Sequence, residues 1–128
     1  MENYLSFFNL VKTKMDILGG NYPTFDVQLY ERTFNIFVLD YKRWYPNDTT
    51  INVKRAILTP QLLAVLMYRL AHECFILPDN HCLKNDADIY AFVGRDMGQI
   101  EIFYSSTIGK GLRINHGVGS VIGARGVS

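Results

Sequence analysis

The sequence has little of several features that would assign a protein to a class at once. Its 128 residues include two cysteines, Cys74 and Cys82, with no CxxC pair and no Cys/His ligand pattern around them. We therefore expect reduced thiols and no metal site. Lys and Arg number 13 against 12 Asp and Glu, a net charge of +1 without a block of like charge. Nothing in this balance indicates a nucleic-acid partner or an anionic membrane surface.

Long apolar runs are missing as well. The chain begins Met1-Glu2-Asn3 without a basic segment, and the apolar patch at Phe7-Phe8 is too short for a signal sequence or a membrane span. We expect a cytoplasmic protein with no membrane partner. Hydrophobic residues make up 48% of the chain and aromatic residues 13%, which is enough for the core of one domain.

Helical spacing dominates the chain up to residue 97. Apolar residues at positions 4, 7, 8, 11, 15 and 18 predict a helix over 2–18. A second helix is expected from Thr24 or Asp26 to about residue 41, with two apolar strips, one of which suits a subunit interface. Thr59-Pro60 predicts the start of a third helix that is apolar nearly all round and ends near Phe75. A fourth is expected over 88–97.

The pattern changes after Gly98. Ile102, Ile108 and Ile114 recur every six residues, and glycine is dense from 109 to 126. A six-residue period with an aliphatic residue at one position is typical of a parallel β-helix, although an ordinary glycine-rich loop is the alternative. The expected fold class is α+β: a helical oligomerisation domain over 1–97, an all-α bundle, followed by the incomplete beginning of a β-helix over 98–128.

Two motifs carry a resemblance to a known family. Residues 99–127, QIEIFYSSTIGKGLRINHGVGSVIGARGV, resemble the serine O-acetyltransferase pattern (D/E)-I-H-P-x-A-x-I-G-x-G-(hydrophobic)-x-(hydrophobic)-D-H-x-x-G-x-V-I-G-E-x-A-V. Upstream, Tyr68-Arg69-Leu70-Ala71-His72 is similar to the Y-R-(I/L)-(A/G)-H run of the same family. Taken together, the resemblance covers about residues 60–127 of this chain. It implies a left-handed β-helix with hexapeptide repeats.

The resemblance also implies an activity, namely acetyl transfer from acetyl-CoA to the hydroxyl of L-serine in cysteine biosynthesis. In the family the site lies between subunits of a trimer, and two trimers meet through their helical regions as a hexamer. His116 matches the catalytic histidine and Glu101 the carboxylate paired with it. Neutral imidazole suits removal of the hydroxyl proton, and a carboxylate behind it fixes the tautomer. No bound cofactor is implied beyond acetyl-CoA as co-substrate, and the CoA-binding residues are not identified.

Several residues depart from the family pattern. Asn115 replaces the aspartate expected to contact the amino group of serine, so it is the candidate substrate-binding residue whose charge is missing. This favours another acceptor, such as a sugar hydroxyl in surface-polysaccharide synthesis. Phe103-Tyr104 replace the usual His-Pro, and Ala124-Arg125 replace Glu and a small residue.

The remaining expectations concern the rest of the chain. We expect structural roles for His72 and for Tyr68-Arg69, and none is assigned to His81. Because the sequence stops at Ser128, the active site is expected to be incomplete, and the chain to oligomerise with little acetyltransferase activity by itself. A non-catalytic oligomerisation module is therefore the third interpretation, beside the acetylation of serine and the acetylation of a sugar.

Overall fold

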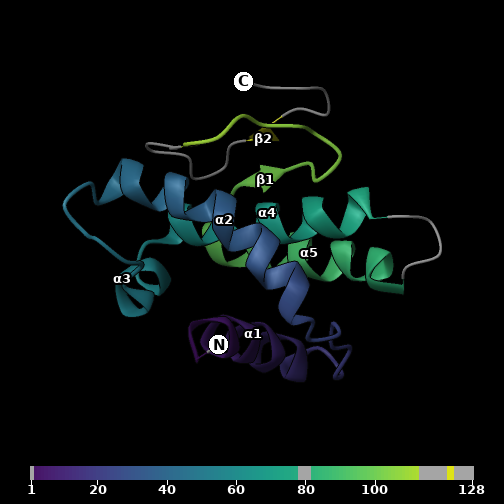
Figure 1. Ribbon diagram of the computed structural model, residues 1–128. Coiled ribbons are helices and arrows are strands. Elements are labelled where there is room, and N and C mark those ends of the chain that lie inside the picture. The colour runs from purple at the N-terminus through teal and green to yellow at the C-terminus, as the bar shows by residue number, and fades with distance from the viewer. Residues whose placement is uncertain (1, 78–81, 113–120, 123–128) are drawn as a thin grey trace.

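Helices form most of the computed structural model, which describes residues 2–77, 82–112 and 121–122 (Figure 1). The α-helices are α1 (Glu2–Ile17), α2 (Val27–Trp44), α3 (Val53–Ile57), α4 (Pro60–Ile76) and α5 (Ala87–Gly98), and a 3₁₀ helix, η1 (Cys82–Asp86), precedes α5. The four predicted helices are thereby confirmed to within a few residues. The short α3 was not predicted, because it has no apolar period of its own. None of the described helices is long and apolar enough to cross a membrane.

The helix starts follow local side-chain chemistry. Asp26 caps α2, where its carboxylate accepts a hydrogen bond of 2.9 Å from the backbone N–H of Leu29. Asn52 caps α3 in the same way, accepting from the N–H of Arg55 at 3.1 Å. Pro60 opens α4 as predicted, but the Thr59 hydroxyl makes no capping bond. It donates instead to the Arg55 carbonyl at 2.8 Å, which joins α3 to α4.

Helix α4 lies at the centre of the fold. Its apolar residues Leu62, Leu63, Val65, Leu66, Met67 and Leu70 are all buried, as expected for a helix that is apolar nearly all round. Helix α5 approaches it closely at glycine positions: a Cβ atom added to Gly98 would lie 2.4 Å from the Ala64 Cβ. The two helices therefore pack almost backbone to backbone at that point.

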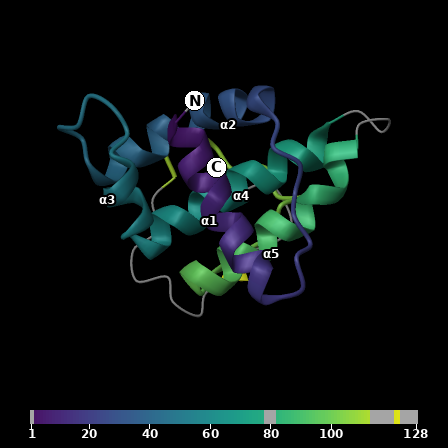
Figure 2. The same ribbon diagram turned by 90° about the horizontal axis from the view of Figure 1, so that it is seen from below.

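The elements form three layers. Helix α1 lies below α4 and α5 and crosses them (Figures 1 and 2), burying Phe7, Phe8, Val11 and Met15. Helices α2, α4 and α5 form the middle layer. The segment that follows α5 runs across the opposite side of this layer from α1 (Figure 1).

The expected beginning of a left-handed β-helix is wrong for the described part of the chain. After Gly98, that part contains two strands of two residues each, β1 (Glu101–Ile102) and β2 (Val121–Ile122), paired in parallel. It contains no stacked coils. Ile114, which was expected to fill such a coil, lies outside the described residues.

The isoleucines that suggested a β-helix have another role. Ile102 and Ile108 are buried with Ile100 against Ala64 and Tyr68 of α4. A six-residue period shows that side chains return to one side of the chain, but it does not specify what covers that side. Here one side of the apolar helix α4 covers them, and a period of six cannot distinguish such a cover from a second coil.

Candidate functional site

Of the predicted site residues, only the backbone of Glu101 falls within the described part of the chain. Glu101 is the first residue of β1, opposite Val121 in the strand pair, and its side chain lies outside the described part. Asn115 and His116 also lie outside the described residues. The geometry of this trio therefore stays a prediction, whereas the other motif of the resemblance, on α4, is described in full.

Tyr68 of α4 joins the helix to the segment after β1. Its hydroxyl donates to the Ser106 carbonyl and accepts from the backbone N–H of Ile108 at 3.2 Å. The side chain is almost fully buried, and burial raises the pKa of the Tyr68 phenol. The phenol therefore stays neutral and keeps the proton that it donates.

Arg69 makes a buried ion pair that ties three parts of the chain together. Its guanidinium donates to the Asp40 carboxylate of α2 at 2.8 and 3.0 Å. The same group donates to the carbonyls of Ile108 at 2.9 Å and Gly109 at 2.8 Å. Asp40 in turn accepts from the backbone N–H of Leu112 at 2.6 Å. Both charges are buried, yet each is bonded to its partner and to backbone groups.

His72 completes the motif one turn further along α4. Its ring stacks on Tyr68, with centroids 5.6 Å apart, and Nδ1 lies 2.6 Å from the Tyr104 carbonyl oxygen. That distance fits a hydrogen bond in which Nδ1 carries the proton. Tyr68, Arg69 and His72, which we call the α4 clamp, therefore hold residues 104–109 against the helix.

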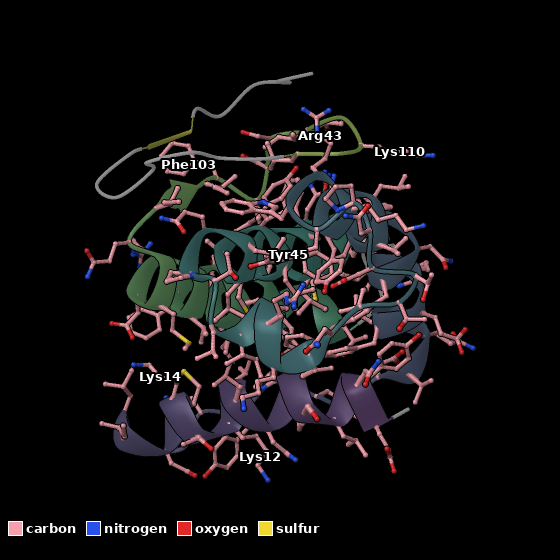
Figure 3. All side chains as sticks on the ribbon, turned by 90° about the vertical axis from the view of Figure 1, so that its left-hand side faces the viewer. Lys12, Lys14, Arg43, Tyr45, Phe103 and Lys110 are labelled. Carbon is pink, nitrogen blue, oxygen red and sulfur yellow. The ribbon has the colours of Figure 1, made fainter. Side chains whose placement is uncertain are left out.

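A cavity of about 540 Å³ opens beside the clamp, between α5 and the segment after β1. Its lining includes Phe75, Asp88, Ala91, Arg95, Phe103 and Tyr104. The Tyr104 hydroxyl donates to Asp88 Oδ1 at 2.6 Å, and this bond with burial raises the pKa of the Tyr104 phenol. Figure 3 shows Phe103 beside this part of the chain, above the helices. We call this space the α5 cavity.

Some residues of the clamp and the cavity carry a signal in the sequence, and others do not. A structural role was expected for the clamp residues, but their partner Asp40 was missed. One signal was present: Asp40 is the acidic residue between Leu39 and Tyr41 on an apolar part of α2. Asp88 and Tyr104 carried no such signal, because they are 16 residues apart. Within the described residues, no three His, Cys, Asp or Glu side chains are grouped to hold a metal ion.

Comparison with known proteins identified no relative of the chain. No protein-family model, curated protein or solved structure matches the chain. The likeness to serine acetyltransferases therefore rests on the residues of the two motifs.

Proposed function

We propose that this chain acts in acetyl-CoA-dependent O-acetylation, in the manner of a serine acetyltransferase, with His116 as general base and Glu101 as its carboxylate partner. The neutral imidazole removes the proton of the acceptor hydroxyl as the oxygen attacks the thioester carbonyl. The tetrahedral intermediate then expels CoA as its thiolate, and the imidazolium returns the proton to the sulfur. Glu101 orients the imidazole and stabilises its charged form.

The observation that carries this proposal is the contact between the two motifs of the resemblance. Tyr68, Arg69 and His72 belong to the first motif, and all three bond to backbone atoms of residues 104–109 in the second. These bonds span 32 to 40 positions along the chain. Two sequence matches that contact each other in the fold are better evidence than two isolated matches. Asp40 also fixes the N–H of Leu112, so the chain leading to Asn115 and His116 starts from an anchored point.

The test is thiol release from acetyl-CoA by the full gene product, with serine and a panel of hydroxyl acceptors. We expect His116→Ala to lower turnover by about 10² to 10⁴ with little effect on acetyl-CoA affinity, because a general base acts mainly in the transition state. Glu101→Gln should have a smaller effect of the same kind. His81→Ala, a histidine with no assigned role, is the matched control. Near-normal turnover by His116→Ala would overturn the assignment.

The acceptor is serine or a related hydroxyl compound, and Asn115 favours a compound without an ammonium group at that position, such as a sugar. An amide lacks the charge with which a carboxylate pairs with an ammonium. If the natural acceptor is a sugar, Asn115→Asp should improve serine acetylation relative to sugar acetylation. Efficient use of serine by the unaltered protein, with no gain from the substitution, would show that its amino group is recognised elsewhere.

Self-association through the helical region is the third part of the proposal. Leu39 on the second apolar strip of α2 remains 39% exposed, and Leu5 of α1 is exposed to the same extent. Burial of such side chains against another copy favours association. A solution mass of a trimer or hexamer supports the proposal, whereas a stable monomer contradicts it. An oligomer without acetyl transfer under any condition would favour the non-catalytic module.

A further inference from the structure

We infer that the α5 cavity is a binding site for a small organic cation, an ammonium group carried on an apolar or ring-shaped body. Its volume of about 540 Å³ lies within the range of roughly 300 to 1,000 Å³ that small-molecule sites occupy. The inference concerns binding and does not depend on the proposed acetyl transfer.

The shape of the cavity follows from the spacing of residues on α5. Asp88, Ala91 and Arg95 occupy positions i, i+3 and i+7, so they share one face of the helix. The two charged residues are separated by about 10 Å along the helix axis, at 1.5 Å per residue. Ala91 lies between them, and its short side chain leaves the middle of the cavity open. The cavity thus has an acidic end and a basic end.

Aromatic rings gather at the acidic end. Tyr104 is bonded to Asp88 through its hydroxyl, and the Phe75 ring lies 5.5 Å from the Tyr104 ring. Phe75 and Phe103 are each 38% exposed, so parts of both rings remain open to a ligand. A carboxylate beside aromatic faces is the arrangement that binds organic ammonium groups, through charge and through the negative faces of the rings.

The position of Asp88 suits a ligand contact. Its Oδ1 is held by the Tyr104 hydroxyl, so the carboxylate has a fixed orientation and keeps its second oxygen as an acceptor. The raised pKa of Tyr104 means that this phenol remains a neutral donor. At the other end the Arg95 guanidinium lies over the Phe92 ring, 5.8 Å from its centroid.

Two probes of similar size, one a cation and the other neutral, test the inference. We expect phenethylamine to bind the full chain about three- to tenfold more tightly than phenethyl alcohol, the increment typical of a partly exposed cation on aromatic rings. Binding is followed by NMR titration, with shifts at Ala91 and Ile102. Equal affinity for the two probes, or shifts confined to other surfaces, would overturn the inference.

Variants separate a ligand contact from a structural role for Asp88. Asp88→Asn should abolish the preference for the amine, and Tyr104→Phe should retain it because the carboxylate remains. Asp96→Asn is the matched control, since Asp96 is on the same helix but pairs with Lys14 of α1. A preference that survives Asp88→Asn, or that is lost in Tyr104→Phe alone, contradicts the site.

The result is independent of the acetyltransferase assay. Amine binding that persists in a protein without acetyl transfer would leave this site standing and overturn the proposed function. Acetyl transfer by a protein that binds neither probe would overturn this site and leave the proposed function standing.

Discussion

Removing the Arg69 guanidinium should destabilise the fold far more than removing a surface charge. Arg69 and Asp40 have side chains 4% and 0% exposed. In Arg69→Met the buried carboxylate would keep one bond from the described chain, that from the Leu112 N–H. Leaving a buried charge without its partner costs about 3–5 kcal/mol. The free energy of unfolding of a small domain is roughly 5–15 kcal/mol, so this change alone would remove a large part of the stability.

The double substitution Asp40→Leu with Arg69→Met tests whether the unpaired charge causes the loss of stability. It removes both charges, so the cost of a buried carboxylate without its partner disappears. The carbonyls of Ile108 and Gly109 still lose their donor, as they do in Arg69→Met, and the Leu112 N–H now loses its acceptor. That last loss costs about 1–3 kcal/mol, less than the cost of the unpaired charge that it replaces. The double variant should therefore be more stable than Arg69→Met, although it carries one substitution more.

The assay is urea unfolding followed by circular dichroism and extrapolated linearly to water. With a slope of about 2 kcal/mol per M, Arg69→Met should lower the midpoint by roughly 2 M. Arg55→Met is the control: its ion pair with Asp48 is largely exposed, with Arg55 at 47%, so it should cost at most about 1 kcal/mol. A loss below 1 kcal/mol in Arg69→Met, or a double variant less stable than the single, would refute the argument.

Three further predictions concern the helical layers. Gly98→Ala should destabilise the chain by about 1–3 kcal/mol, because the new methyl group would meet the Ala64 Cβ. Adding Ala64→Gly should recover part of this loss in the same urea assay. No recovery would contradict the close approach of the two helices. Burial raises the pKa of the Cys74 thiol to about 12, so in a Cys82→Ser background we expect alkylation only on unfolding, and rapid labelling of the native protein at pH 7 would disprove it. Burial also raises the pKa of the Asp86 carboxyl, so its charged form costs stability at neutral pH, and this cost is relieved as the pH falls through the raised pKa. The stability of Asp86→Asn relative to the parent chain should accordingly decrease on acidification. An increase would contradict this prediction.

Local chemistry was enough to predict where the four longer helices lie. A cap such as Asp26 bonds to a backbone group three residues away, and Pro60 at the first helical position acts within one turn, so both signals are contained in adjacent residues. The apolar residues from Leu62 to Met67 likewise predicted that α4 is buried, because they leave this part of the helix no polar face to turn to water.

The contacts that build the clamp and the cavity depend on residues far apart in the chain. Arg69 meets Asp40 across 29 positions and Ile108 across 39, and no periodicity specifies such pairings. The spacing of Ile102 and Ile108 showed correctly that they share one side, but only the packing against Ala64 and Tyr68 decided that a helix covers it. Asp88 and Tyr104 became neighbours because α5 and the segment after β1 lie side by side, an arrangement that depends on how closely glycine lets α5 approach α4.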